Sequence, residues 1–152
     1  MADAEAHWAG EDDEHARRFG WYPKRSTLEG VSKFLAETER QWREGGARRT
    51  WAIRQASTGV LVGGCEARLK DDGTAHLSWW IFAQYRRRRF ASRGVRLMIS
   101  YAARTLGVRH FVAFVEPDNL ASRGVAVNTG LVELELDTSG ERPMLRYELH
   151  LE

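Results

Sequence analysis

Residues 76–103, HLSWWIFAQYRRRRFASRGVRLMISYAA, decide how the rest of the chain is organised. The first seven are rich in aromatic and β-branched residues and contain neither Gly nor Pro, which predicts a buried strand. Four arginines follow at 86–89, and apolar residues then recur at helical spacing: Phe90, Ala91, Val95, Met98, Tyr101 and Ala102. A strand that enters a helix through a short basic loop favours anion binding, because the first helical amides lack intrahelical partners.

The composition predicts one domain over residues 1–152. The chain is 43% hydrophobic, which is enough for a single well-formed core. A net charge of only +2 excludes a globally basic nucleic-acid binder. The single cysteine, Cys65, excludes an internal disulfide and is expected to be a buried small residue. No apolar run approaches the roughly 20 residues of a membrane span, and the N-terminus is acidic, so we expect a cytoplasmic protein.

Periodicity and turn residues predict four helices and six strands in one mixed sheet, an α/β architecture. The first two helices are expected at 12–19 and 26–43, the second opening on a capping box formed by Ser26 and Glu29. The other helices are expected at 90–106 and 119–128. The predicted strands are 51–55, 60–70, 74–82, 110–115, 133–137 and 145–151.

Three features between Trp51 and Tyr147 resemble a known family when taken in order. They are WWIF followed by the arginine loop and FASRGV, then VEPDN at 115–119, then Asn119-x-x-Ser122 followed by NTGL at 128–131. The set resembles the GNAT superfamily of acyl-CoA-dependent N-acetyltransferases, and within it the branch of ribosomal-protein N-terminal acetyltransferases. The resemblance implies a mostly antiparallel central sheet of six to seven strands flanked by about four helices.

The sequence departs from the family pattern in two places. With Arg86 aligned to the start of the pyrophosphate motif Q/R-x-x-G-x-G/A, Arg89 stands where glycine is usual. We expect Arg89 to fit if its φ is negative and its side chain points outward, and otherwise to block the loop. The β-strand that usually precedes the first helix is also missing. Either the true start lies upstream, or a neighbouring subunit supplies the edge strand, as in a homodimer.

The resemblance implies direct transfer of the acetyl group from acetyl-CoA to a primary amine, a protein N-terminus or a small amine, in a ternary complex. It places oxyanion donors at the end of the third strand, Ser122 near the sulfur and Asn119 beside the pantetheine arm. No metal is expected, because the histidines and the cysteine show no ligand spacing. The implied cofactor-binding residues are Trp80, Ile81, Phe82, Arg86, Arg87, Arg88, Arg89, Phe90, Ala91, Ser92, Asn119 and Ser122.

The general base stays open at this point. Glu66 and Glu133 are the catalytic candidates named with Ser122, and Glu116, Glu135 and His76 are further alternatives. In this fold the acceptor site is built from the early helices and the last hairpin, here 20–45 and 132–148. The content of these segments predicts a partly aromatic, acidic cleft for a cationic amine, with Trp21, Tyr22, Trp42, Glu133, Glu135 and Asp137.

Two other functions are weighed against acetyl transfer. Arg89 and the missing first strand favour a degenerate relative that keeps the fold and binds a ligand without turnover. The arginine run with its neighbours Tyr85 and Phe90 would suit a nucleic-acid-binding domain. The small net charge makes nucleic acid the less favoured partner, and a steep salt dependence of oligonucleotide binding would indicate it.

Overall fold

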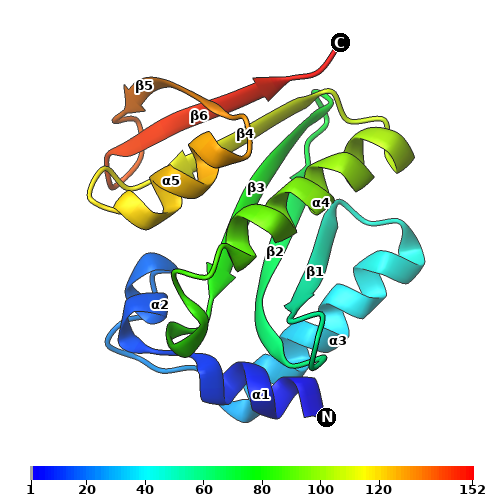
Figure 1. Ribbon diagram of the computed structural model, residues 1–152, viewed down its shortest axis with the longest axis vertical. Helices are drawn as coiled ribbons and strands as arrows, with labels where there is room; N and C mark the ends of the chain where they lie inside the picture. Colours follow the sequence, from blue (N-terminus) through cyan, green and yellow to red (C-terminus); the bar gives the residue numbers. More distant parts are fainter. Residues whose placement is uncertain (1) are drawn as a thin grey trace.

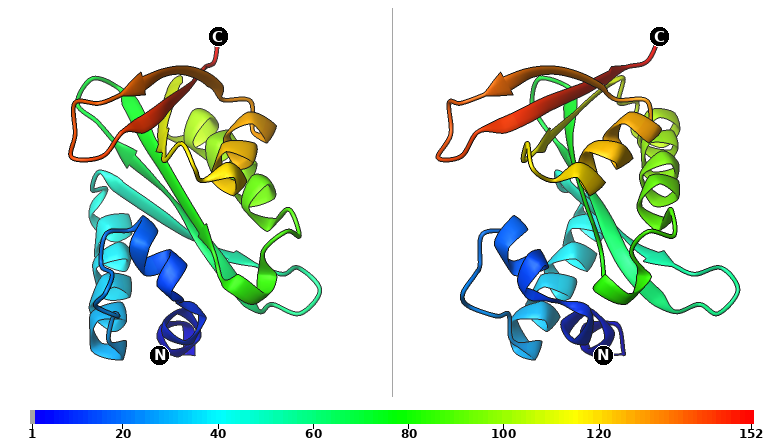
Figure 2. Two further views of the ribbon diagram at one scale, coloured as in Figure 1. Left: turned by 90° about the vertical axis from the view of Figure 1, so that its left-hand side faces the viewer. Right: turned by 60° about the vertical axis from the view of Figure 1, so that its left-hand side comes forward.

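The computed structural model describes residues 2–152, which form one six-stranded sheet with helices on both faces (Figure 1). Helices α1–α3 lie against one face of the first three strands, and α4 and α5 lie against the other face (Figure 2). The predicted α/β class is therefore confirmed. The elements are α1 Ala2–Gly10, α2 Asp13–Arg18, α3 Leu28–Glu44, β1 Arg48–Arg54, β2 Leu61–Leu69, β3 Thr74–Ile81, a 3-10 turn Ala83–Tyr85, α4 Phe90–Thr105, β4 His110–Val115, α5 Leu120–Asn128, β5 Val132–Asp137 and β6 Met144–His150.

The sheet opens between its two central strands. The strand order is β1-β2-β3-β4-β6-β5, and only β3 and β4 are parallel, because the chain crosses over through α4 between them. Their pairing runs from Thr74 opposite His110 to Leu77 opposite Ala113, four residues before β3 ends at Ile81. Beyond that point the strands separate, as Figure 1 shows, so the end of β3 has an unpaired edge beside α4 and α5.

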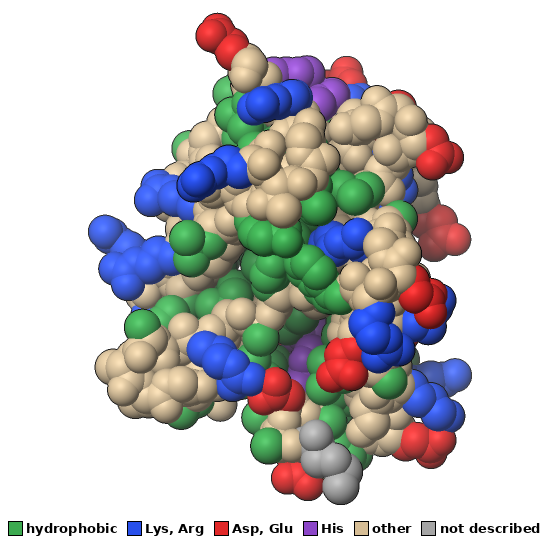
Figure 3. Space-filling view, turned by 90° about the vertical axis from the view of Figure 1, so that its right-hand side faces the viewer, with side chains coloured by type: hydrophobic (Ala, Val, Ile, Leu, Met, Phe, Trp, Pro, Cys, Tyr) green, Lys and Arg blue, Asp and Glu red, His purple; other side chains and the backbone are tan. Residues whose placement is uncertain are grey.

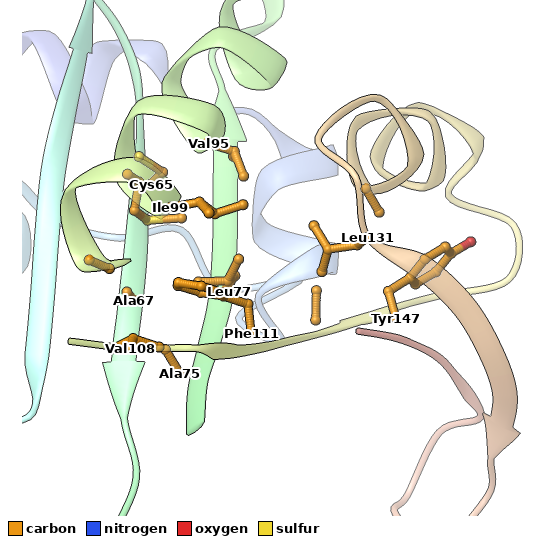
Figure 4. Close-up of a cluster of buried hydrophobic side chains, with 14 of the residues drawn as sticks. Cys65, Ala67, Ala75, Leu77, Val95, Ile99, Val108, Phe111, Leu131 and Tyr147 are labelled. Carbon is orange, nitrogen blue, oxygen red and sulfur yellow. The ribbon is translucent and has the colours of Figure 1, made fainter. Parts of the chain in front are cut away.

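The core lies between the sheet and α4. One face of α4 buries Val95, Met98, Ile99 and Ala102 against inward-facing residues of β2, β3 and β4 (Figure 4). Cys65 belongs to this core, and burial raises the pKa of its thiol to about 12, so it packs as a small apolar residue. The prediction of a buried cysteine is confirmed.

The N-terminal helices differ from their prediction. The helix expected at 12–19 is confirmed as α2, but α1 precedes it and was not predicted. Asp12 caps α2, and its carboxylate accepts from the His15 amide at 2.8 Å. The sequence of α1 carries only a weak apolar face, which is why periodicity missed it. Its last residue must be small, because a Cβ on Gly10 would lie 2.4 Å from the Phe82 ring.

The start of α3 also differs. Thr27, not Ser26, is its cap and accepts from the Gly30 amide at 3.0 Å, while the Ser26 hydroxyl bonds to Glu11. Residues 2–47 contain no strand, so β1 is an edge strand, as the missing first strand implied. None of the described helices is long and apolar enough to cross a membrane.

Candidate active site

A cavity of about 470 Å³ occupies the place where β3 and β4 separate. We call it the loop cavity. It contains every sequence-predicted cofactor residue except Phe82, whose ring is buried beneath α1. The lining residues are Glu14, His15, Arg18, Phe19, Trp79, Trp80, Ile81, Tyr85, Arg86, Arg87, Arg88, Arg89, Phe90, Ala91, Ser92, Asn119, Ala121, Ser122 and Val125.

The loop before α4 presents a row of free amides. Arg87 and Arg89 both have φ of 62°, in the left-handed region, and α4 begins without a side-chain cap. The first bond inside the helix is from the Arg93 amide to the Arg89 carbonyl, at 3.2 Å. Within residues 2–152, the six backbone N–H groups from Arg87 to Ser92 have no protein acceptor. Successive amides in such a turn at a helix start form a concave site for an anion.

The backbone conformation of Arg89 shows how an arginine is accommodated where the motif usually has glycine. The expectation that Arg89 fits only with a negative φ is wrong, because its φ is 62°, in the left-handed region that glycine adopts readily. A left-handed non-glycine residue costs about 1–2 kcal/mol, which the surrounding fold must offset. The cavity is not closed by this substitution, since Arg89 lines it together with its neighbours.

The four arginines divide into two roles. Arg86 holds the loop to the start of α2, with bonds of 2.9 and 3.0 Å to Asp12 and a third bond from Nε to the Ile81 carbonyl at 3.1 Å. For the side chains of Arg87, Arg88 and Arg89, the described part of the chain offers no hydrogen bond or ion pair. These three are therefore the charges available to a ligand, and Arg88 lies over the Tyr85 ring at 6.0 Å.

The unpaired edge of β3 supplies further donors. The Phe82 amide bonds to the Val62 carbonyl at 3.0 Å, so it faces β2 and is occupied. Because backbone amides alternate in direction along a strand, those of Trp79 and Ile81 face the gap that β4 has left. Among the residues expected to donate to an oxyanion, Ile81 has an amide directed into the loop cavity and Phe82 has not.

Helix α5 begins on the opposite side of the loop cavity. Asn119 caps it, with Oδ1 accepting from the Ser122 amide at 3.1 Å. This cap holds the first turn of α5 in place, and Ser122, which belongs to that turn, lines the loop cavity. The cavity is therefore bounded by two helix N-termini and three unpaired arginines, an electropositive environment.

A second cavity, of about 760 Å³, lies on the other face of the sheet beneath α1–α3. We call it the aromatic cavity. Trp80 forms part of its floor, lying so close to β2 that a Cβ on Gly64 would be 2.3 Å from the indole ring. Three residues line both cavities, His15, Phe19 and Trp80, so the two cavities meet there. The aromatic cavity is lined by His7, Glu11, His15, Phe19, Gly20, Trp21, Lys24, Arg25, Ser26, Gly30, Val31, Phe34, Arg48, Glu66, Arg68, Ser78 and Trp80.

Two buried histidines and a carboxylate form a cluster in the aromatic cavity. His7 and His15 are only 7% and 5% exposed, and His7 Nε2 is 3.2 Å from Glu11 Oε1. Burial lowers the pKa of His15 to about 4, so its imidazole is neutral near pH 7. The sequence analysis missed this cluster. The four-residue spacing of 7, 11 and 15 was the available signal, but the helix predicted at 12–19 does not include His7 or Glu11.

The predicted carboxylate bases are all engaged with arginines. Glu66 lies in the aromatic cavity, 3.1 Å from Arg68 and 3.4 Å from Arg48. Glu116 is bound between Arg18 and Arg142. Guanidinium partners favour the charged carboxylate and weaken it as a base.

The remaining candidates lie outside both cavities. Glu133 bonds to the Tyr147 hydroxyl and lies 3.3 Å from Arg123. Glu135 is 3.9 Å from Arg146, and the His76 ring packs on Phe114 at 5.6 Å between centroids. None of these three lines the loop cavity or the aromatic cavity.

The segments predicted to build the acceptor site lie in different places. Eight residues between Gly20 and Phe34 line the aromatic cavity, with Trp21 among them. Segment 132–148 lines neither this cavity nor the loop cavity, so the acidic wall expected from the last hairpin stays a prediction. Trp42 packs instead on Trp51 and Tyr101, at 5.2 and 6.0 Å between ring centroids.

Comparison with known proteins gives one family and many structural relatives. Residues 1–132 match the family profile described as acetyltransferase (GNAT) domain. A search of curated proteins by sequence gives no match. Similar solved structures include the ribosomal alpha-N-protein acetyltransferase RimL with coenzyme A (14% identity, TM-score 0.84, covering 98% of this chain and 88% of that one). RimJ from Mycobacterium smegmatis with CoA-disulfide (17%, 0.82, 99% and 78%) and spermidine N-acetyltransferase from Vibrio cholerae with CoA and spermine (12%, 0.80, 99% and 90%) are also similar.

Proposed function

Because this chain belongs to the GNAT acetyltransferase family, we propose that it transfers an acetyl group from acetyl-CoA to a primary amine, with the cofactor in the loop cavity and the amine in the aromatic cavity. The observation that carries this assignment is the row of six amides from Arg87 to Ser92, for which the described residues offer no acceptor. A pyrophosphate offers the oxygens that such a row lacks. Arg87, Arg88 and Arg89 add the charge that phosphate oxygens pair with.

The pantetheine arm then follows the gap between β3 and β4 toward the place where the cavities meet. The amides of Trp79 and Ile81 donate to the oxygen of the thioester carbonyl as it becomes an oxyanion. Ser122 lies on the opposite side of the loop cavity, at the start of α5, where its hydroxyl donates a proton to the sulfur of CoA. Asn119 acts through Ser122, because its cap fixes the first turn from which Ser122 projects.

The reaction makes one bond and breaks one. The amine nitrogen bonds to the acetyl carbon, the carbon–sulfur bond breaks, and CoA leaves. The nitrogen loses a proton as it becomes an amide, and the sulfur gains one from the Ser122 hydroxyl, which is reprotonated by water. No redox partner or metal is required for this balance.

His15 is the base that we propose for the amine proton. It lines both cavities, and burial lowers its pKa, so its imidazole has a free lone pair at neutral pH. The nitrogen becomes strongly acidic once it has attacked the carbonyl, so a weakly basic imidazole is sufficient to take its proton. Glu66 and Glu116 are less suited, because each is ion-paired with two arginines.

The acceptor class follows from the rings around this point. Phe19, Trp21 and Trp80 surround His15, with ring centroids between 4.8 and 6.3 Å from its own. Aromatic faces attract an ammonium group, which loses its first proton to water so that the neutral amine can attack; His15 takes only the second proton, after the attack. A protein N-terminus and a small amine both fit this proposal as acceptors. The cytoplasmic location and the homodimer that were predicted from the sequence also stay part of the proposal. The non-catalytic alternative loses its main argument, because Arg89 keeps the glycine-like backbone.

Binding and turnover test the proposal separately. Calorimetric titration of the full chain with acetyl-CoA should give binding that the Arg87→Ala, Arg88→Ala double variant weakens about tenfold or more, while Arg104→Ala at the far end of α4 does not. CoA release with a panel of primary amines then measures turnover. His15→Gln should lower kcat about tenfold or more and leave acetyl-CoA affinity unchanged. Absence of acetyl-CoA binding would refute the assignment.

A further inference from the structure

A second histidine cluster lies far from both cavities, on the uncovered face of strands β4 and β6. The antiparallel register places His110 opposite His150 and Val112 opposite Glu148. Side chains two residues apart on a strand share a face, and directly opposite residues are neighbours, so the two histidines and Glu148 project together. Figure 3 shows histidine side chains gathered on the surface at this end of the molecule, beside the C-terminus.

The ligand atoms of the three side chains all lie within 4.8 Å of one another. Glu148 Oε2 is 3.0 Å from Nε2 of His110 and 3.0 Å from Nε2 of His150. The two imidazole rings are stacked with centroids 3.9 Å apart. His110 Nε2 is buried and, within the described residues, has no hydrogen-bond partner of acceptable geometry. The Glu148 carboxylate lies close to this nitrogen, but the poor hydrogen-bond geometry leaves the nitrogen open to a metal ion.

We propose that His110, Glu148 and His150 bind one divalent transition-metal ion, of which zinc is the best match. Two imidazoles and one carboxylate are a ligand set that zinc accepts, with water in the fourth position. Metal bonds of about 2.0–2.2 Å in a tetrahedron place the ligand atoms about 3.3 Å apart, close to the 3.0 Å between Glu148 Oε2 and each ring nitrogen. The stacked imidazole rings would rotate apart for both nitrogens to face one ion. Arg146 contacts the other oxygen of Glu148, so Oε2 remains directed at the histidines.

The spacing of residues in the sequence could not predict this site, because its ligands come from two strands. His110 lies 38 positions before Glu148, and only the register of β4 against β6 brings them together. A bound ion would cross-link the last strand to a central one. It would therefore stabilise the C-terminal part of the sheet without taking part in acetyl transfer.

The test is a zinc titration of the full chain after removal of metal by a chelator. We expect one equivalent to bind, and His150→Ala and Glu148→Gln each to weaken binding about tenfold or more. His150 is 66% exposed, so its replacement leaves the fold intact. His76→Ala is the matched control, since His76 lies on the same sheet face but outside the cluster, and it should leave affinity unchanged.

The cluster of His7, Glu11 and His15 is the competing site, and one variant separates the two. If His7→Ala abolishes zinc binding while His150→Ala does not, the ion belongs to the aromatic cavity and the proposal is wrong. Absence of zinc binding also overturns it. Cobalt provides a second readout, because its visible absorption reports tetrahedral coordination. The cobalt spectrum should disappear in His150→Ala and persist in His7→Ala.

Discussion

Helices α4 and α5 begin on opposite sides of the same cavity, but only α5 is closed by a side chain. Asn119 caps α5 by accepting from the Ser122 amide with its side chain, whereas Arg89 at the start of α4 makes no side-chain cap and has a left-handed backbone. Helix α2, which also reaches this cavity, is capped by Asp12. The capped helices satisfy their own donors, and α4 leaves its donors for a ligand.

The comparison distinguishes two uses of a helix start. A capped start contributes to stability and holds a side chain such as Ser122 in place. The uncapped start of α4 carries a cost in backbone strain and unsatisfied amides, which a bound pyrophosphate would offset. Substitutions at the two starts should therefore affect different quantities.

Charge reversal at the open start should have the largest effect. Arg89→Asp replaces a phosphate partner with a like charge beside the free amides, so acetyl-CoA affinity should fall about 100-fold. Isothermal titration calorimetry measures the change. Arg104→Asp, with the same change of charge on the last turn of α4, is the control and should bind acetyl-CoA as the parent chain does. Equal losses in both variants would mean that net charge, not the loop, binds the cofactor.

The first turn of α2 offers a test by pH. Burial lowers the pKa of His15 to about 4, so between pH 7 and pH 5 the unfolded chain takes up a proton that the folded chain does not. The free energy of unfolding should fall by about 2 kcal/mol over this range on account of His15. Denaturant unfolding of the parent chain and of His15→Gln at both pH values measures the difference. If the free energy of unfolding of His15→Gln falls just as much between pH 7 and pH 5, other titratable groups cause the pH dependence.

The capped start of α5 should affect turnover more than binding. Ser122→Ala removes the proposed proton donor to sulfur but leaves the amide that Asn119 caps. We expect kcat to fall about tenfold, a small effect for a general acid because a thiolate leaves readily. Steady-state kinetics with the best acceptor provides the measurement. A fall in acetyl-CoA affinity with unchanged kcat would place Ser122 in binding rather than in catalysis.

Stability should respond with opposite signs at the two starts. Asn119→Ala removes a cap and should lower the free energy of unfolding by about 1 kcal/mol. Arg89→Gly relieves the left-handed strain and should raise it by about 0.5–1 kcal/mol, after the greater freedom of glycine in the unfolded chain is deducted. Urea denaturation of both variants tests the pair. A destabilised Arg89→Gly would mean that the arginine side chain supports the loop.

The sequence predicted the fold and the loop cavity because both are encoded locally. The apolar pattern of 76–103 contains the strand, the basic loop and the helix that line the loop cavity, where we propose the anion site. The aromatic cavity was only partly predicted, because its walls come from α1–α3 and the first three strands, brought together by long-range packing. His15 could not be chosen as a base from sequence, since its neutrality results from burial against Trp80 and Phe19. The positive φ of Arg89 also had no local signal, because an arginine there favours a negative φ.

Amide chemical shifts would report directly whether the free amides from Arg87 to Ser92 bind the phosphates of CoA, as we propose. Titration of the nitrogen-15-labelled chain with CoA should shift these six resonances more than any others. Titration with pantetheine, which lacks the phosphates, should leave them in place. If CoA binds while these amides remain unshifted, the start of α4 is not the phosphate site and the account is wrong.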